Sequence, residues 1–287
     1  MPLRRLITAP RPVRGHAKRP AGSQSLERGL DILEMIEAEG AELGVRELAR
    51  RADLSPTIVQ RLISSLALRG YVEKNSETSR YRLGHRSLSL GASSERAFDY
   101  AVTARQELER LAREHHLNGF VSVLRGGRAI YVLAVQADGP VAIKVSPGSD
   151  MPLHSTSAGK VLLAALSDSE ARKLLGNRKL AAITPHTITD AGVLVAALAR
   201  VRRQGFATVN EENIPGVLSV GAPIRDRAGN VVAALSVAFP KYLDSGLTLA
   251  SVEPLVMGAA LRVSRMLGMP SAMLLTGVTG SASGGTQ

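Results

Sequence analysis

The chain has 287 residues, of which 45% are hydrophobic, 21% are charged and 3% are aromatic, and it contains no cysteine. This length suits two domains, each with a core of its own, and the hydrophobic share excludes general disorder. The lack of cysteine excludes disulfides and cysteine-ligated zinc, and it favours a cytoplasmic protein over a secreted one. No apolar run approaches the ~20 residues of a membrane-spanning helix, so no membrane partner is expected.

Positive charge is concentrated in two segments of the N-terminal third. The formal net charge of the chain is +11; residues 1–22 carry +6, residues 23–45 carry −5 and residues 46–86 carry +5. A polyanion, first of all double-stranded DNA, is the partner to expect for such segments. Four prolines and a lack of acidic residues predict a disordered basic arm at 1–22. Small and polar residues predict a flexible tail at 269–287.

Residues 23–84 have the pattern of a winged helix-turn-helix DNA-binding domain. Apolar residues at helical spacing predict helices from about 25 to 39, 45 to 51 and 56 to 69, and Ser55 and Pro56 are suited to start the third. Residues 71–74 and 80–83 predict a β-hairpin. In such a domain one helix enters the major groove of DNA, and the hairpin, or wing, contacts phosphates.

The outward face of the third predicted helix supplies candidates for reading bases. Gln60 and Arg61 can make bidentate hydrogen bonds with adenine and guanine, and Thr57 or Ile58 can contact a thymine methyl. The predicted DNA-binding residues are Arg46, Ser55, Thr57, Ile58, Gln60, Arg61, Lys74, Arg80 and Arg82. Each arginine alone could be an ordinary solvated surface charge. Their combination with the Ser-Pro helix start and the change of charge from −5 to +5 favours DNA binding.

The rest of the sequence predicts a linker helix at 85–99 and an α+β domain at 100–268. Apolar periodicity predicts helices at about 101–115, 157–166, 168–175, 190–204 and 247–267. Runs rich in β-branched residues predict strands within 120–136, at 140–145, at 217–224 and at 231–239. This order of helices and strands is typical of an antiparallel sheet with helices packed on it.

Several segments resemble the IclR family of bacterial transcriptional regulators, over about residues 24 to 268. In the first domain they are QSLERGLDILEMI, LGVRELARRADLSPTIVQRLISSLALRGYV and RYRLG. In the second they are DMPLHSTSAGKVLLAAL, ATVNEENIPGVLSVGAPIRDRAGNVVAALSVAFP and the closing helix. The resemblance implies a GAF-like ligand domain, a homodimer or homotetramer, and a pseudo-palindromic operator. It also implies a small organic acid as effector, aromatic acids included, and a repressor more often than an activator.

The same resemblance places the effector pocket between the loop before Ser157 and the strands that carry Ser219 and Ser236. The effector-binding residues that it implies are Ile143, Ser157, Ala158, Asn210, Leu218, Ser219 and Ser236. Family members often have cysteine at position 219 and acids at 209 and 210, so this pocket is expected to be less negatively charged. In the sequence itself each serine interrupts an apolar strand, and its hydroxyl needs either a ligand or a backbone carbonyl as partner.

Two alternatives remain open on the sequence alone. The chain could be a non-regulatory DNA-binding protein whose second half only oligomerises, or a small-acid hydrolase that uses His154 and a strand serine. The sequence has no phosphate-binding loop, no G-x-S-x-G turn and no metal-ligand spacing. An enzyme, a cofactor and a metal site are therefore not expected, and a ligand-controlled transcriptional regulator is the preferred interpretation.

Overall fold

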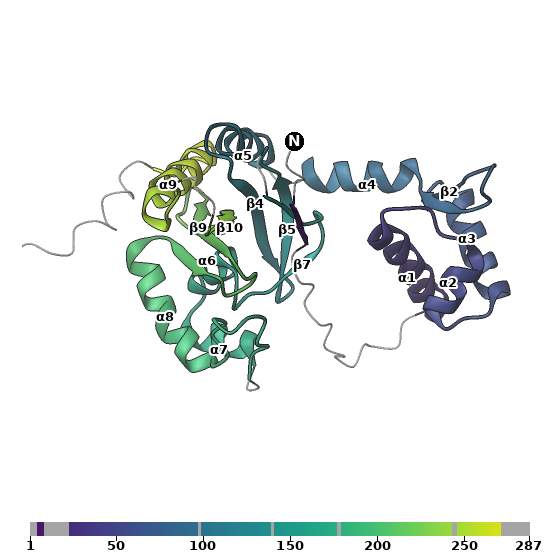
Figure 1. The fold of residues 1–287 in the computed structure, drawn as a ribbon, viewed down its shortest axis with the longest axis horizontal. Coiled ribbons are helices and arrows are strands. Elements are labelled where there is room, and N and C mark those ends of the chain that lie inside the picture. Colours follow the sequence, from purple (N-terminus) through teal and green to yellow (C-terminus); the bar gives the residue numbers. More distant parts are fainter. Residues whose placement is uncertain are drawn as a thin grey trace, which may run out of the picture. The chain divides into compact units, whose positions relative to one another are not determined.

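The computed structural model describes residues 5–8, 23–96, 99–138, 141–176, 179–242 and 246–270 (Figure 1). The chain divides into two compact units, Arg14–Phe98 and Met1–Val13 together with Asp99–Gln287. Each unit has a buried hydrophobic cluster of its own. Among the described helices none is long and apolar enough to cross a membrane.

The first unit is a winged helix. Its helices and strands are α1 (Gln24–Glu39), α2 (Val45–Ala52), α3 (Pro56–Leu68), β2 (Val72–Lys74) and β3 (Tyr81–Leu83). Apolar side chains at helical spacing, such as Ile32 and Ile36 of α1 and Val59 and Ile63 of α3, are buried together with Tyr81 of the hairpin. This shared core fixes α3 against the other two helices and the wing.

Helix α4 (His85–Arg96) follows the wing directly. Its first turn is tied to the winged helix because the Ser87 hydroxyl donates to the Tyr71 carbonyl at 2.9 Å. Gly70 has a φ of +75°, and a Cβ there would lie 2.6 Å from the His85 ring. Glycine is therefore required where α3 ends and α4 begins its contact with the wing.

The second unit is built on one antiparallel sheet with the strand order β7-β5-β4-β10-β9-β8. The strands are β4 (Asn118–Arg125), β5 (Arg128–Val135), β7 (Asp150–Met151), β8 (Ala207–Asn210), β9 (Val217–Arg225) and β10 (Val231–Pro240). The helices are α5 (Ala101–His115), α6 (Ser157–Ala164), α7 (Asp168–Leu175), α8 (Ala191–Gln204) and α9 (Leu249–Met266). The α+β fold expected from the sequence is confirmed.

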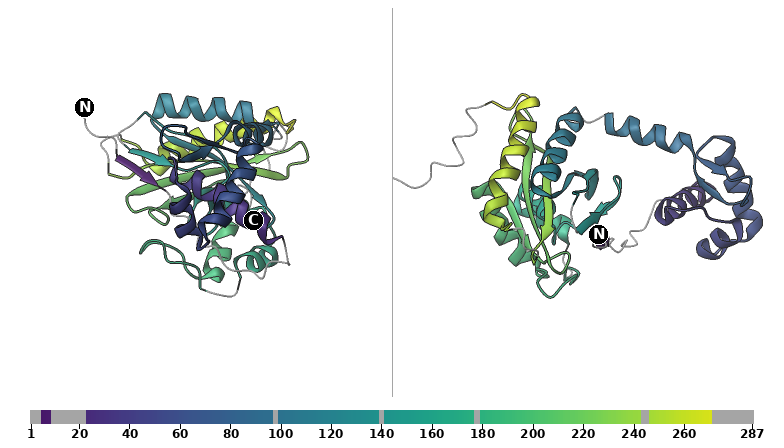
Figure 2. Two further views of the ribbon diagram at one scale, coloured as in Figure 1. Left: turned by 90° about the vertical axis from the view of Figure 1, so that its right-hand side faces the viewer. Right: turned by 45° about the horizontal axis from the view of Figure 1, so that its top comes forward.

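Helices cover both faces of this sheet, with α5 and α9 on one face and α6 on the other (Figures 1 and 2). Two glycines show how closely the helices approach. A Cβ on Gly119 would lie 2.7 Å from Leu108 of α5, and a Cβ on Gly221 would lie 2.9 Å from the Ser157 carbonyl carbon of α6. Because Ser236 pairs with both Gly221 and Phe120, these three residues share the face that α6 covers.

The structure differs from the sequence prediction around β6 (Val141–Lys144). This segment was expected to join the main sheet, but it pairs in parallel with β1 (Arg5–Thr8). The predicted disorder of residues 1–22 is therefore wrong for these four residues, because a short β-prone stretch there finds a strand to pair with. The remainder of the predicted arm, and the predicted tail beyond residue 270, lie outside the described residues.

Candidate DNA-binding and effector sites

Helix α3 presents an open polar stripe. Its residues Thr57, Gln60, Arg61 and Ser64 follow a spacing of three and four, and all of them are exposed. Val59 and Ile63 on the opposite side are fully buried. A helix held in this way can present one row of side chains to a groove without losing its core contacts.

Ser55 and Ile58 have different roles from the other residues predicted on α3. The Ser55 hydroxyl accepts a hydrogen bond from the Ile58 backbone N–H at 3.4 Å, so Ser55 caps the N-terminus of the helix. The Ile58 side chain is partly buried rather than fully outward. Base contacts would therefore come mainly from Thr57, Gln60 and Arg61.

The two reading candidates Gln60 and Arg61 differ in how firmly they are held. The Gln60 amide donates to the Ser64 hydroxyl at 3.2 Å and to the Tyr81 hydroxyl at 3.4 Å. These bonds orient the amide before any DNA binds. The Arg61 guanidinium is exposed and has no carboxylate partner among the described residues, as expected for a side chain kept available for an external acceptor.

The wing cations divide into paired and unpaired ones. Arg80 donates to the Glu42 carbonyl at 3.0 Å and to the Glu47 carboxylate at 2.8 Å. Arg82 bonds to Glu73 at 2.6 Å. Lys74 is exposed, like Arg46 on α2, and neither has an ion-pair partner within the described part of the chain. Arg80 therefore differs from its predicted role, because it holds the wing in place instead of extending from it toward a phosphate.

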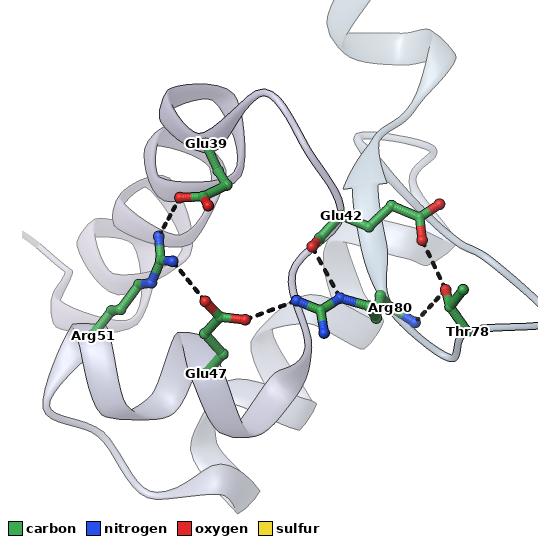
Figure 3. Close-up of polar contacts among 6 residues, drawn as sticks. All are labelled: Glu39, Glu42, Glu47, Arg51, Thr78 and Arg80. Atoms are coloured by element: carbon green, nitrogen blue, oxygen red, sulfur yellow. Dashed lines mark hydrogen bonds and ion pairs between the residues drawn. The ribbon is translucent and has the colours of Figure 1, made fainter.

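Figure 3 shows the polar network to which Arg80 belongs. Arg51 forms ion pairs with Glu39 and Glu47, each at 2.6 Å. Glu47 forms a second ion pair, with Arg80 at 2.8 Å. Glu42 accepts hydrogen bonds from Asn75 at 2.8 Å and Thr78 at 2.7 Å. The network links the end of α1, helix α2 and the turn of the wing, so it sets where the wing lies relative to α3.

The network also explains two shifted pKa values. Hydrogen bonds from Asn75 and Thr78 lower the pKa of Glu42. The hydrogen bond and charge of Arg51 lower the pKa of Glu39. Both acids come from the acidic segment 23–45. Glu39 pairs with α2 and Glu42 with the wing, and the sequence could not show this because the partners lie more than ten residues away.

A small cavity of about 40 Å³ lies in the second unit, between the α6 face of the sheet and the start of α6. Its lining includes five of the predicted effector-binding residues, namely Ile143, Ser157, Ala158, Ser219 and Ser236. Leu218 and Asn210 do not line it, which corrects the prediction. They pair with each other, and because strand neighbours alternate between faces, Val209 and Ser219 point inward instead.

The polar wall of the cavity consists of hydroxyl groups. The Ser157 and Ser219 hydroxyl oxygens lie 2.5 Å apart, and the Ser155 hydroxyl donates to the Asn213 amide oxygen at 3.0 Å. Ser236 is only 4% exposed, and its hydroxyl has no hydrogen-bond partner among the described residues. Because Ser236 lines the cavity, this hydroxyl is open to a ligand or an ordered water.

Beside these hydroxyl groups, on the same face of the sheet, the cavity has an aromatic part without charge. Phe120 and Tyr131 meet edge to face with ring centroids 5.7 Å apart. Burial raises the pKa of Tyr131, so its phenol stays neutral at physiological pH. The lining contains no ionisable acid or base apart from this phenol. The sequence did not single out Phe120, Tyr131, Ser155 or Asn213.

The start of α6 is firmly anchored. The Thr156 hydroxyl accepts from the Gly159 N–H at 3.0 Å and donates to the Pro152 carbonyl at 2.7 Å. The first backbone N–H groups of a helix have no acceptors within the helix, and they favour an anion. A carboxylate could thus bind at this end of the cavity.

Charged residues near the cavity are paired. Lys160 is buried and bonds to Glu212, while Lys241 and the Gly216 N–H bond to Glu211. These contacts, with Lys241 the strongest, lower the pKa of Glu211 to about 2. His154 does not line the cavity; its ring contacts the Ala181 carbonyl at 2.9 Å. Among the described residues no cluster of acidic and histidine side chains could hold a metal ion.

Comparisons with known proteins assign both units to one family. Residues 25–76 match the IclR helix-turn-helix domain, and residues 96–265 match the family model described as bacterial transcriptional regulator IclR C-terminal. The HTH-type transcriptional regulator XynR of Escherichia coli (strain K12) is 31% identical over 248 residues, which are 86% of this chain and 98% of XynR. The HTH-type transcriptional repressor AllR of Salmonella typhi is 29% identical over 90% of this chain and 95% of AllR.

The fold is likewise shared with solved structures. A crystal structure of an IclR homologue from Microbacterium hydrocarbonoxydans, complexed with 4-hydroxybenzoate, matches with a TM-score of 0.75 at 23% identity. The match covers 85% of this chain and 99% of that chain. Both relatives are named as HTH-type transcriptional regulators or repressors. This chain therefore belongs to the IclR family of bacterial transcriptional regulators.

Proposed function

We propose that this protein is a repressor that binds a pseudo-palindromic operator as a homodimer or homotetramer and responds to a small organic acid. The observation that carries the effector part is the cavity with the unpartnered Ser236 hydroxyl, the Ser157–Ser219 pair and the start of α6. Such a regulator would act in the cytoplasm, where bacterial DNA is found.

The proposed DNA contact is the α3 stripe together with the unpaired cations around it. Thr57, Gln60 and Arg61 would read base edges in the major groove. Lys74 on the wing and Arg46 on α2 would bind phosphates, which adds affinity without sequence preference. Paired Arg80 and Arg82 would contribute by holding the wing in position.

The proposed effector is a monocarboxylate with a compact apolar body. Its carboxylate would accept hydrogen bonds from Ser236, from the Ser157–Ser219 pair and from the N-terminus of α6, and its body would pack on Phe120 and Tyr131. The relative from Microbacterium hydrocarbonoxydans was crystallised with 4-hydroxybenzoate, which makes this acid a reasonable first probe. A cavity of about 40 Å³ holds only a few water molecules, so an aromatic acid would have to open it.

This opening supplies the proposed mechanism. A ligand shifts a conformational equilibrium only when it binds one state better than another. Because the acid would fit only the opened cavity, its binding energy would favour a conformation in which the start of α6 has moved. The repressor assignment is supported by the relative AllR, which is named a repressor.

Assembly is supported by exposed apolar residues of α1. Leu26 and Leu30 lie one turn apart and are 63% and 49% exposed. A second copy could cover them, and two linked winged helices on two half-sites would reach the affinity that a single reading helix seldom achieves.

The effector proposal is tested by thermal unfolding of the full chain with 4-hydroxybenzoate and a series of aliphatic acids. An acid at a hundred times its dissociation constant adds about 2.7 kcal/mol to the stability, enough for a clear rise in Tm. The rise in Tm should be smaller in Ser236→Ala. It should be unchanged in Ser169→Ala, which alters an exposed serine of α7. An equal rise in wild type and Ser236→Ala would place the ligand elsewhere.

A further inference from the structure

The proposed effector cavity is lined in part by two separate pieces of chain, the start of α6 and the loop 211–216 that joins β8 to β9. Ser157 and Ala158 belong to α6, and Asn213 and Ile214 belong to the loop. An aromatic acid is too large for a cavity of about 40 Å³, so some of its walls must move apart to admit one. The contacts between the loop and α6 oppose one such movement.

Among the described residues, two side-chain hydrogen bonds join the loop to α6 and the residues just before it. The Ser155 hydroxyl donates to the Asn213 amide oxygen at 3.0 Å. The Lys160 ammonium group donates to the Glu212 carboxylate at 2.5 Å. Lys160 follows Ser157 by three residues, so it lies on the same side of the helix, next to the cavity. We call these two contacts the seam.

The loop is also held by contacts that do not involve α6. The Glu211 carboxylate pairs with Lys241, and the Glu211 carbonyl accepts a hydrogen bond from the Thr184 hydroxyl at 2.7 Å. The Glu212 carbonyl accepts one from the Thr187 hydroxyl, also at 2.7 Å. The loop would keep these contacts if the seam came apart.

The ion pair of the seam is buried but only partly satisfied. The side chains of Lys160 and Glu212 are 8% and 12% exposed. Glu212 uses its Oε1 atom for Lys160, and its buried Oε2 atom has no hydrogen-bond partner within the described part of the chain. Attraction between buried charges offsets their loss of hydration only when the remaining polar atoms are also bonded. Separation would return both charges to water, so this pair is suited to open as well as to close.

We propose that the Lys160–Glu212 pair is a latch that determines which acids the effector cavity admits. While the latch is closed, only a very small acid fits. When it opens, the loop and α6 separate and an aromatic acid can enter. This inference rests on the proposed effector function and adds the residues that set its size selectivity. Neither residue lines the closed cavity, so both act by positioning its walls.

Two variants should affect the latch in opposite ways. Glu212→Gln leaves the buried Lys160 charge without a carboxylate, and opening relieves this because water can then reach the ammonium group. Lys160→Met/Glu212→Met removes both charges at once, and its apolar side chains should keep the loop against α6. The single variant is therefore expected to open the cavity, and the double variant is expected to close it again.

The first test measures opening without any acid. Because the chain has no cysteine, a thiol introduced by Ser236→Cys reports access to the cavity through its rate of alkylation by iodoacetamide. Adding Glu212→Gln should raise this rate about tenfold, because a larger fraction of the protein is open. Adding Lys160→Met/Glu212→Met should restore the slow rate. The matched control is Glu109→Gln, which changes an exposed glutamate of α5 on the other face of the sheet and should leave the rate unchanged.

A second thiol separates opening from unfolding. Ser264→Cys places it in α9, at a position that is 1% exposed and lies outside the cavity. Glu212→Gln should not speed its alkylation. If Glu212→Gln fails to fold, Ser155→Ala breaks the other contact of the seam without leaving a buried charge, and it should still speed alkylation at position 236. No faster alkylation at 236 in either variant, or equally faster alkylation at 236 and 264, would overturn the latch.

The second test is calorimetry with two acids of different size, on chains without introduced cysteines. The apparent affinity of a ligand falls with the fraction of protein in the state that binds it, so Glu212→Gln should bind 4-hydroxybenzoate about tenfold more tightly than wild type does. Its affinity for acetate should stay within about twofold of wild type. An equal gain for both acids would overturn the proposed size selectivity. Faster alkylation without binding of any acid would support the latch and contradict the proposed effector.

Discussion

The hydroxyl oxygens of Ser157 and Ser219 lie 2.5 Å apart, and this contact joins the first residue of α6 to strand β9 at the wall of the effector cavity. A carboxylate entering the cavity would compete for both hydroxyl protons, because it accepts stronger, charge-assisted hydrogen bonds than a hydroxyl does. Binding would thus replace a contact between helix and sheet with contacts to the ligand. The start of α6 is the part of the second unit that we expect to respond first.

Replacing both Ser219 and Ser236 by alanine should abolish the response to the effector and leave operator binding intact. The hydroxyls line the cavity, whereas operator binding is assigned to the winged helix, which is a separate unit. Isothermal calorimetry with the acid found by thermal screening measures the first effect, and gel-shift titration measures the second. Ser169→Ala is the control. Unchanged affinity for the acid in the double variant would remove both serines from the site.

Arg61→Ala should relax specificity at one base pair of the operator, at a cost of about 1–3 kcal/mol, since a bidentate contact to a base is lost. Lys74→Ala should instead weaken binding to all sequences alike, because phosphates carry no sequence information. Gel-shift titrations on operator and random DNA at fixed salt separate the two effects. The control is Arg113→Ala, which removes an exposed arginine from α5 in the other unit. Equal weakening of both DNAs by Arg61→Ala would show that α3 does not read bases.

The Glu42 contacts with the wing should make the winged helix sensitive to acid. The pKa of Glu42 is lowered in the folded state, so its contribution to stability is present above the usual glutamate pKa of about 4.3 and is lost as the pH falls through the folded-state value. Glu42→Gln should therefore be less stable than wild type at pH 7, with the difference shrinking toward pH 3. Urea unfolding at several pH values measures this, and a constant difference would contradict the network described in Figure 3.

Gly221→Ala should destabilise the second unit by about 1–3 kcal/mol, as other overpacking substitutions do. Its added Cβ would lie 2.9–3.1 Å from backbone atoms of Ser157 and Ala158, which cannot move without shifting α6. Gly91→Ala in α4 is the matched comparison, because no atom lies within 4 Å of its added Cβ. Alanine there should stabilise the helix by about 0.5–1 kcal/mol. Thermal unfolding of both variants measures the two changes in stability. An equal change in Gly221→Ala and Gly91→Ala would contradict the close packing of α6 on β9.

Local sequence signals were sufficient for most helices. The Ser55-Pro56 start and the apolar spacing of α3 each act within a few residues, and the structure contains both. The inward serines of β9 and β10 could also be predicted, because each breaks an apolar strand.

Contacts between distant segments could not be predicted. Arg80 pairs with Glu47, which lies 33 residues earlier in the chain, and no local pattern in the sequence indicates this pair. The family resemblance implies both Leu218 and Ser219 as effector contacts, but neighbours on a strand face opposite sides, and only Ser219 lines the cavity. Pairing of β6 with Arg5–Thr8 depends on segments more than 130 residues apart, for which the sequence offered only a short β-prone stretch.

The central claim is that an acid in the effector cavity controls operator binding by the winged helix. The most direct measurement is a gel-shift titration of one operator with the full chain at fixed salt, with and without a saturating acid, for wild type and Ser236→Ala. The account predicts a change of at least tenfold in wild-type operator affinity on adding the acid, and little or no change in Ser236→Ala. An operator affinity that does not depend on the acid, or that changes equally in both proteins, would contradict it.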